Sequence, residues 1–405
     1  MDIIVQKFGG SSLTTKEVRD RAINKIVDIK NKGYYPVVVV SAMGRNGDPY
    51  ATDTLLGLVK PIYSNLAKRE MDLLLSCGEI ISAVVFVAAL EERGYPAVAL
   101  TGGQAGIITD SNFSNAKILQ VNPKKIIDFL HKGKIVVVAG FQGITEKNEI
   151  TTLGRGGSDT TASALGVALN AVEIQIYTDV DGIMTADPRI VPDAKILEVI
   201  TYHEICEMAL QGAKVIHPRA VEIAMEKGIP IRVKNTFTDA EGTLIIAHDS
   251  RKTKIKNDRI ITGISYIENV VQIKVNISSP STKAETELKV FRTLAENSIS
   301  LDLLNILSDV IIFTVQESEA EKAVDLLKRN GFDVQVRPDC AKVSVVGAGM
   351  RGMPGVMATI VEALNKAKVD ILQTADSHTT ISCLVKMSEL VNAVKALHDS
   401  FDLGY

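Results

Sequence analysis

The sequence predicts an α/β protein, in which a layered domain with a mainly parallel sheet is followed by two small βαββαβ modules. Short β-branched runs alternate with amphipathic stretches over roughly the first 250 residues, which is typical of a parallel sheet covered by helices. The remaining part contains an internal repeat. A chain of 405 residues is also too long for one ordinary core, so we expect two or three domains.

Six apolar runs in the first part are predicted strands, because continuous apolar runs suit parallel strands that are buried on both faces. They span 2–8, 36–42, 96–100, 134–141, 173–179 and 229–235. Five amphipathic stretches between them are predicted helices. These span 15–32, 78–93, 123–132, 158–170 and 218–227.

A repeat with an offset of 70 residues follows the polar stretch 247–259. The run 271–275 matches 341–345, and the helical stretch that begins at 318 matches the one that begins at 388. Each copy reads strand, helix, strand, strand, helix, which predicts one small module used twice. We expect a first domain at 1–246, a linker at 247–259, and the two modules at 260–338 and 339–405. This division allows for strands exchanged between the two modules.

Composition argues against several classes of protein. The net charge of −3 shows no basic excess, so we expect no nucleic-acid partner. The four cysteines form no C-x-x-C motif and are predicted to be reduced thiols. The chain begins directly with a predicted strand and its longest apolar run is "AVVFVAAL", so we expect a cytoplasmic protein without a membrane partner.

The stretch "VQKFGGSSL" places Lys7 at the end of the first predicted strand, directly before two glycines and two serines. Glycine lacks the Cβ that would keep an anion away from the backbone, and successive N–H groups can bind one cluster of oxygens. The order is not that of a P-loop, in which the lysine follows the glycines. An anion-binding loop and a plain tight turn both explain these residues.

A second candidate anion site is "TLGRGGSDTTASALGVAL", in which Arg155 precedes a predicted helix. Ser158 or Asp159 is predicted to cap this helix. A helix N-terminus attracts anions, and a guanidinium can bind both oxygens of a carboxylate. The alternative is a glycine-rich connection with an ordinary cap.

Three further stretches carry polar groups. "YTDVDGIMTADPR" leaves a strand and is predicted to bring Thr178, Asp179, Asp181 and Asp187 near Arg189, which suits a ligand crevice at the carboxyl edge of an open sheet. "GAKVIHP" contains Lys214, and without other evidence this residue is predicted to be an ordinary surface lysine. "LLLSCGEIIS" contains Glu79, predicted to open a helix, where an acid often only complements the helix dipole.

Taken together, six stretches resemble the aspartokinases, a branch of the amino-acid kinase family. They occur in the family's order: "KFGG", "SAM", "SCGE", "LGRGGSD", "YTDVDGIMTADPR" and "GAKVIHP". The repeat resembles the paired ACT regulatory modules of these enzymes, and the resemblance covers the whole chain. "ILQTADSHTT" and "SAMGRNGDPYATDTLL" look most like the monofunctional, diaminopimelate- or lysine-responsive aspartokinases of Gram-positive bacteria.

The resemblance implies the reaction ATP + L-aspartate → 4-phospho-L-aspartate + ADP with Mg²⁺, the entry to lysine, diaminopimelate, threonine and methionine. It implies that Lys7 acts on the transferred phosphoryl group and that Asp159 orients Lys7. Arg155 would hold the α-carboxylate of aspartate and Glu79 its α-ammonium. Further substrate positions are Ser41, Thr52, Gly156, Gly157 and Ser158. Further nucleotide positions are Phe8, Gly9, Gly10, Ser11, Thr178, Asp179, Met184, Arg189 and Lys214. No metal ligand is assigned.

The resemblance also implies feedback regulation by an amino acid, either lysine, diaminopimelate or threonine, and at least a homodimer formed through the ACT modules. Candidate effector residues are Thr282, Asp302, Met350 and Ile371. Two alternatives stay open. One is another amino-acid kinase, of the glutamate type, which would lack the repeat. The other is a catalytically silent amino-acid sensor.

Overall fold

A computed structural model of the chain describes residues 1–213, 215–247, 260–277, 283–350 and 353–404. The contacts divide the chain into two compact units. The first unit comprises Met1–Ile183, Ile196–Ala209 and Lys214–Ile255, and the second comprises Met184–Lys195, Leu210–Ala213 and Lys256–Tyr405. The predicted boundary near residue 250 therefore does not describe the whole division, because two short segments before it pack with the second unit.

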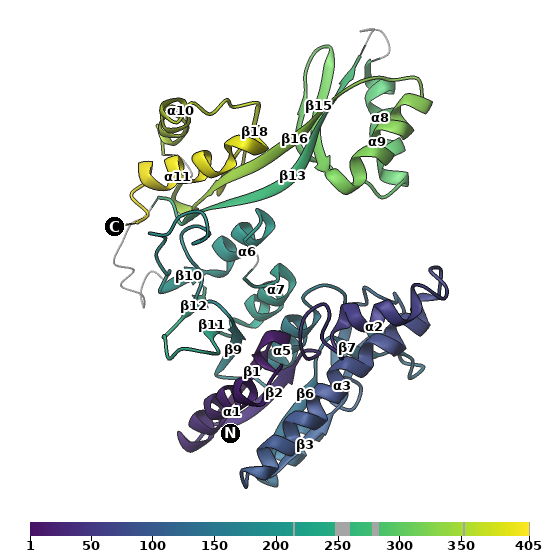
Figure 1. The fold of residues 1–405 in the computed structure, drawn as a ribbon, viewed down its shortest axis with the longest axis vertical. Helices are drawn as coiled ribbons and strands as arrows, with labels where there is room; N and C mark the ends of the chain where they lie inside the picture. The colour runs from purple at the N-terminus through teal and green to yellow at the C-terminus, as the bar shows by residue number, and fades with distance from the viewer. Residues whose placement is uncertain (214, 248–259, 278–282, 351–352, 405) are drawn as a thin grey trace. The chain divides into compact units, whose positions relative to one another are not determined.

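The first unit is built on a mainly parallel sheet of eight strands in the order β10-β12-β11-β9-β1-β2-β6-β3 (Figure 1). Only the β11–β12 pair is antiparallel. The strands are β1 (Ile3–Phe8), β2 (Tyr35–Val40), β3 (Ala97–Leu100), β6 (Ile135–Ala139), β9 (Glu173–Thr178), β10 (Val199–Thr201), β11 (Ile231–Asn235) and β12 (Thr243–Ile246). The six predicted strands are confirmed, and all β6 residues are buried, as a central parallel strand requires.

Seven helices belong to the first unit. They are α1 (Lys16–Asn31), α2 (Thr52–Val59), α3 (Lys68–Glu92), α4 (Lys124–His131), α5 (Gly157–Ala168), α6 (Tyr202–Leu210) and α7 (Pro218–Lys227). The prediction that Glu79 opens a helix is wrong, because α3 begins ten residues before 78. The buried face of α3 continues through Asp72, and a carboxylate there looks in the sequence like the end of an apolar stripe.

A second, smaller sheet was not predicted. Its order is β5-β4-β7-β8, with β4 (Ile107–Thr109), β5 (Ile118–Val121), β7 (Gln142–Ile144) and β8 (Ile150–Thr152). These strands have only three or four residues each, too few to show a period of two. The chain leaves β8 directly into the loop that carries Arg155.

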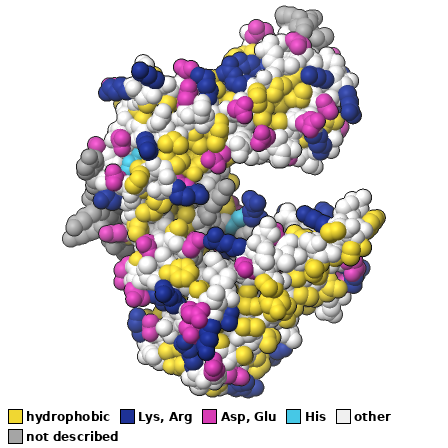
Figure 2. All heavy atoms as spheres, in the orientation of Figure 1, with side chains coloured by type: hydrophobic (Ala, Val, Ile, Leu, Met, Phe, Trp, Pro, Cys, Tyr) yellow, Lys and Arg dark blue, Asp and Glu magenta, His cyan; other side chains and the backbone are white. Residues whose placement is uncertain are grey.

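Helix α3 is long and apolar enough to cross a membrane by length and composition alone. One face, however, buries Asp72 and Glu79 within the first unit, as the core helix of a soluble protein can. Figure 2 shows hydrophobic side chains at the surface along α2 and α3, where Leu58 and Leu73 are exposed. We therefore interpret α3 as part of a soluble fold.

The second unit contains an antiparallel sheet of six strands in the order β14-β15-β13-β16-β18-β17. Its strands are β13 (Gly263–Asn276), β14 (Asp302–Ile306), β15 (Val310–Gln316), β16 (Asp333–Val346), β17 (Gln373–Asp376) and β18 (Thr380–Lys386). Its helices are α8 (Lys283–Glu296), α9 (Glu317–Arg329), α10 (Val356–Lys366) and α11 (Leu390–Ser400). The predicted repeat is confirmed, since β15 and β18 begin 70 residues apart.

The two long strands β13 and β16 run side by side through both modules (Figure 1). The C-terminal half of β13 pairs with β15, whereas its N-terminal half, 263–267, pairs with 342–346 of β16. Helices α8 and α9 accompany one half of the sheet, and α10 and α11 the other. The start of β13 thus lies in the second module, although its sequence falls within the predicted bounds of the first.

The segment Met184–Lys195 packs into the core of the second unit. Ala186, Val191 and Ala194 are buried in one cluster with residues of β16, α10 and α11. The Ile264 N–H donates to the Thr185 carbonyl at 2.7 Å, and the Thr185 hydroxyl lies 3.0 Å from Nε2 of the buried His398. Twelve residues between β9 and β10 therefore belong to the folded core of the other unit.

Candidate active site

The candidate site lies where the carboxyl ends of parallel strands meet in the first unit, the usual ligand edge of such a sheet. The loop after β1 lies beside the loop after β2, since the Ser41 N–H donates to the Phe8 carbonyl and the Gly44 N–H to the Gly10 carbonyl. A Cβ on Gly10 would lie 2.6 Å from the carbonyl oxygens of Ala42 and Gly44. Gly10 is therefore required for the two loops to meet.

Lys7 and Asp159 form the central ion pair. Nζ of Lys7, at the end of β1, lies 2.7 Å from Oδ1 of Asp159 in the first turn of α5, and each side chain is 13% exposed. A Cβ on Gly9 would lie 3.7 Å from the same Nζ, so bare backbone stands next to the ammonium. The structure thus brings together two residues that are 152 positions apart in the sequence.

The predicted nucleotide residue Phe8 has its side chain in the core, where its ring stacks on Tyr177 with centroids 4.7 Å apart. The neighbouring Ser12 is buried and shares a hydrogen bond of 2.7 Å with Thr236. Only the backbone of this stretch, together with Ser11, is available to a ligand. The stacking of Phe8 on Tyr177 and the buried hydrogen bond between Ser12 and Thr236 hold this loop in place.

Glu79 is a buried carboxylate on α3, 3% exposed. Its Oε1 accepts a hydrogen bond of 3.1 Å from the Ala42 N–H, and its Oε2 has no hydrogen-bond partner among the described residues. Burial raises the pKa of this carboxyl to about 8, although backbone hydrogen bonds act in the opposite direction. Gly78 permits the close approach, because a Cβ there would lie 2.9 Å from that of Ala42.

Arg155 lies on the loop between β8 and α5 and is exposed. The loop is shaped by Gly154 and Gly156, whose φ angles of +76° and +69° favour glycine. The predicted cap by Ser158 or Asp159 is wrong: the N-cap is Gly156, without a side-chain hydrogen bond, and both side chains lie inside the first turn. The sharp left-handed turn at Gly156 starts the helix two residues earlier than a side-chain cap would.

The remaining substrate candidates surround this centre. Gly157 is buried, and Ser158 is 8% exposed with its Oγ facing the backbone at Gly140, where an added Cβ would lie 2.9 Å away. Ser41 is half-buried after β2, and Thr52 is the first residue of α2. These positions are consistent with pocket residues, but their contacts to a substrate stay a prediction.

His217 is a neighbour that the sequence did not reveal. It caps α7, and a Cβ on Gly156 would lie 2.4 Å from the His217 side chain, so this side chain packs against the Arg155 loop. Burial lowers the pKa of His217, while the nearby Asp159 carboxylate opposes this shift. The motif "GAKVIHP" contained the residue, but only the long-range contact gives it a place in the site.

The segment after β9 divides between the two units. Thr178 donates to Asp179 at 3.2 Å, and Asp179 also pairs with Arg45 at 2.7 Å. Asp181 instead accepts hydrogen bonds from Asn235 and Thr238. Asp187 and Arg189 belong to the second unit, so the expected cluster of all these residues stays a prediction.

The other predicted nucleotide residues of this segment belong to the second unit. Met184 packs on its core, and Arg189 forms an exposed ion pair of 2.6 Å with Asp187. Lys214 lies outside the described residues. Nucleotide contacts of these residues stay a prediction.

In the second unit, Asp302 on β14 pairs with the buried Lys342 on β16. Met350 is buried in the core. Ile371 lines a cavity of about 750 Å³ together with Arg337 and Asp370. Thr282 lies outside the described residues. The three described effector positions thus have different surroundings, and Asp302 is the one of them that holds a charge.

This chain is similar to known proteins over its full length. Residues 2–235 match the amino acid kinase family, and residues 335–399 match an ACT domain. Aspartokinase 1 of Bacillus subtilis is 51% identical over 407 residues, covering 100% of both chains, and aspartokinase 2 of the same organism is 41% identical over 415 residues, covering 98% of its own length. The crystal structure of E. coli aspartokinase III in complex with aspartate and ADP superposes with a TM-score of 0.81 at 25% identity, covering 98% of this chain and 99% of that one.

The first unit and its matched residues define a member of the amino acid kinase family that carries a C-terminal ACT domain. Within that class the chain belongs to the aspartokinases, because relatives of that kind match it over its full length. The resemblance deduced from the six motifs is confirmed.

Proposed function

We propose that this site transfers the γ-phosphoryl group of ATP to the side-chain carboxylate of L-aspartate, giving 4-phospho-L-aspartate and ADP. The observation that carries the proposal is the Lys7–Asp159 pair at the carboxyl edge of the sheet, with bare backbone at Gly9 beside the ammonium. Phosphoryl transfer needs positioning and charge stabilisation more than covalent chemistry by the protein. One aimed cation beside an exposed backbone meets that requirement.

In this proposal, Lys7 stabilises the charge that develops on the transferred group, and Asp159 holds its ammonium in place. Backbone N–H groups of Gly9, Gly10 and Ser11 bind phosphate oxygens. No general base is needed, since the β-carboxylate of aspartate is already ionised at neutral pH. The nucleotide side of the pocket includes Thr178 and Asp179.

Aspartate is recognised by charges of opposite sign. Arg155 binds its α-carboxylate, for which a guanidinium fork is suited. Glu79 binds its α-ammonium, which supplies the cation that no described residue places beside this buried carboxylate. Ser41, Thr52 and the turn 156–158 complete the pocket.

ATP is expected to bind with Mg²⁺. No cluster of three or more acidic, histidine or cysteine side chains exists among the described residues, so the protein does not form a metal cage of its own there. This fits Mg²⁺ in kinases, which is held by phosphates with one or two carboxylates. Asp159 is the carboxylate that would hold it, and the ion would neutralise phosphate charge.

We further propose that the repeat senses lysine, diaminopimelate or threonine, and that the chain works in the cytoplasm as a homodimer or larger assembly formed through its ACT modules. The proposed functional division is a catalytic domain that ends at 246, a linker that ends at 259, and two ACT modules that meet after 338. Asp302 is the candidate partner of an effector ammonium, because it is acidic and half-exposed at a sheet edge.

An ADP-release assay with aspartate, glutamate and N-acetylglutamate as acceptors tests the activity. We expect turnover with aspartate alone. Turnover with glutamate instead would favour the other kinase type. Amino-acid binding without any ADP release would favour the silent sensor. Calorimetric titration with lysine, threonine and diaminopimelate, singly and in pairs, identifies the effector.

A further inference from the structure

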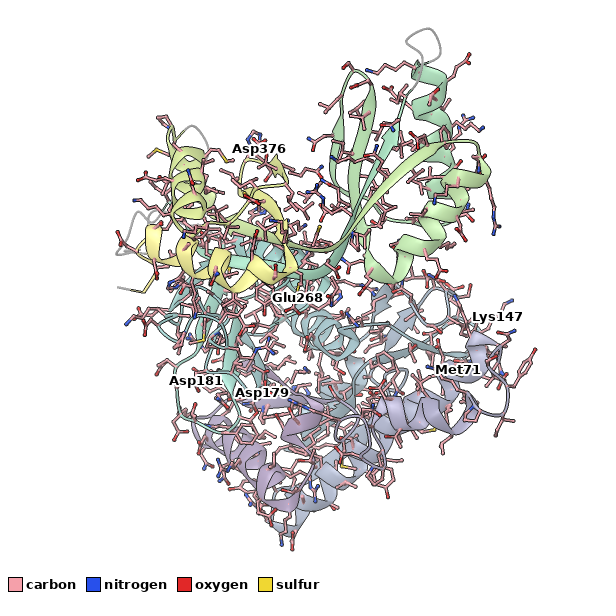
Figure 3. All side chains as sticks on the ribbon, turned by 45° about the horizontal axis from the view of Figure 1, so that its top comes forward. Met71, Lys147, Asp179, Asp181, Glu268 and Asp376 are labelled. Atoms are coloured by element: carbon pink, nitrogen blue, oxygen red, sulfur yellow. The ribbon has the colours of Figure 1, made fainter. Side chains whose placement is uncertain are left out.

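Asp72 is a fully buried carboxylate that the mechanism described above does not use. It lies on α3, seven residues before Glu79, and therefore on the same face of the helix two turns away. Met71 and Lys147 mark this end of α3 and the β7–β8 turn in Figure 3. Arg69 and Glu149 join the same two elements by an ion pair of 2.7 Å.

The carboxylate of Asp72 accepts four hydrogen bonds from two residues. The Ser114 N–H donates at 2.8 Å and its hydroxyl at 3.1 Å, and the Thr152 N–H and hydroxyl both donate at 2.8 Å. Oδ2 accepts the two backbone N–H groups, and Oδ1 accepts the two hydroxyl groups. A carboxylate can act as acceptor to all four, whereas the amide of asparagine cannot.

Thr152 is the last residue of β8, directly before the Arg155 loop and three residues before Arg155 itself. The same stretch is held from its other side by Arg219, which donates to the Leu153 carbonyl at 3.2 Å and to the Ala116 carbonyl at 2.9 Å. The Ala116 N–H in turn donates to the Thr152 carbonyl at 2.9 Å. The backbone at the start of the Arg155 loop is thus held by hydrogen bonds with the Asp72 carboxylate and the Arg219 guanidinium.

We propose that Asp72 is a positioning residue for Arg155. It ties the entry of the Arg155 loop to the helix that carries Glu79, so that the partners of the aspartate α-carboxylate and α-ammonium keep a fixed separation. This inference rests on the proposed roles of Arg155 and Glu79. Its physical basis is that a small displacement of a charged group strongly weakens binding of a rigid dipolar substrate.

The sharpest variant is Thr152→Val, which removes one hydroxyl bond to Asp72 while preserving the shape of the side chain. We expect the KM for aspartate to rise about tenfold and the KM for ATP to stay within about twofold, since one hydrogen bond to a charged group is lost at the loop entry. Asp72→Asn should act in the same direction and more strongly. Thr152→Ser, which keeps the hydroxyl, should restore the aspartate KM.

A matched control is Thr109→Val. Thr109 is buried in the same small sheet and shares a 2.6 Å hydroxyl bond with Thr151, the neighbour of Thr152. It has no bond to Asp72. We expect Thr109→Val to lower the thermal midpoint about as much as Thr152→Val but to leave the aspartate KM unchanged. Equal rises in the aspartate KM for both variants would overturn the positioning role and leave Asp72 as part of the general fold.

A double-mutant cycle with Arg155→Ala separates this inference from the proposed function. If Asp72 acts through Arg155, Thr152→Val should change the aspartate KM less than twofold in the Arg155→Ala background. Full, independent effects of the two changes would overturn the inference. If Arg155→Ala alone leaves the aspartate KM unchanged, the proposed role of Arg155 fails and the inference fails with it. If Arg155→Ala raises that KM and Thr152→Val does not, only the inference fails.

Discussion

Lys7 and Glu79 are two charged residues of the same candidate site, and their surroundings differ. Lys7 is paired with Asp159 at 2.7 Å, and both side chains keep some access to solvent. Glu79 is more deeply buried and receives one backbone N–H but no cation from the described residues, and burial raises its pKa to about 8. The Lys7 ammonium has a charged partner within the protein, whereas in the proposed function the Glu79 carboxylate gains one from the substrate.

The difference shows how one site can use a paired charge to orient a reacting group and an unpaired charge to bind a substrate. A paired cation is already oriented for phosphoryl transfer and loses little freedom when the nucleotide binds. A buried acid without a partner carries a desolvation cost, which a substrate ammonium relieves on binding. Removing Lys7 should therefore affect mainly turnover, and removing Glu79 mainly aspartate affinity.

The largest effect is expected for Lys7→Ala, because it removes the cation from the reacting phosphoryl group. We expect kcat to fall by about 10²–10³, the scale for losing one preorganised donor. Lys25→Ala, which breaks the 2.5 Å pair with Asp239, serves as the control and should leave kcat within about twofold. ADP release at saturating substrates measures both. A Lys7→Ala turnover within about fivefold of the parent would remove Lys7 from the mechanism.

Glu79→Gln should come next. Loss of the negative charge is expected to cost aspartate binding about 2–3 kcal/mol, roughly 30- to 150-fold in KM, while ATP affinity is spared. Glu70→Gln on the exposed face of the same helix should change neither. A fall in nucleotide affinity with unchanged aspartate KM would reverse the assignment of the two ends of the site.

The pH dependence follows from the same carboxyl. With its pKa near 8, the fraction of charged Glu79 in the free protein rises roughly eightfold between pH 7 and 8.5, and kcat/KM for aspartate should rise with it. Between its ordinary value of 4.5 and 8 the folded state binds more protons than the unfolded state, so this group lowers the free energy of unfolding as pH rises through that window. Both trends should disappear in Glu79→Gln. A flat parent profile would contradict the raised pKa.

The smallest effect concerns the charge pair of the second unit. Asp302→Asn leaves the buried Lys342 without its carboxylate partner and removes the proposed site for an effector ammonium. We expect effector affinity to fall about fivefold, the scale of about 1 kcal/mol for losing one solvent-accessible charge pair, and uninhibited kcat to stay within about twofold. Asp325→Asn, in an exposed pair on α9, is the control. Unchanged calorimetric affinity would exclude Asp302 from the effector site.

The sequence predicted those parts of the fold that local patterns encode. Apolar runs located six of the eight strands of the main sheet, and the 70-residue offset located the repeated modules. Glu79 was placed at a helix start because buried Asp72 interrupts the apolar stripe of α3. The pairing of Lys7 with Asp159 was implied only by family resemblance, since no local pattern connects residues so far apart.

Asp72 and His217 were missed for the same physical reason. Their roles arise from partners such as Thr152 and Gly156, which lie on other elements and are brought near only by the folded sheet. Met184 and Arg189 were assigned to the nucleotide by the family resemblance, and this assignment stays a prediction. Their segment packs with the second unit, because Ala186, Val191 and Ala194 find their apolar partners there.

That segment determines where chimeras between aspartokinases can be joined. A regulatory half exchanged at residue 259 would leave Ala186, Val191 and Ala194 facing a foreign core formed by the new α10 and α11. An exchange that also carries Met184–Lys195 and Leu210–Ala213 keeps each core with its own residues. The unit that can be transplanted from one enzyme to another is therefore discontinuous in the sequence, with its shortest pieces lying inside the kinase half.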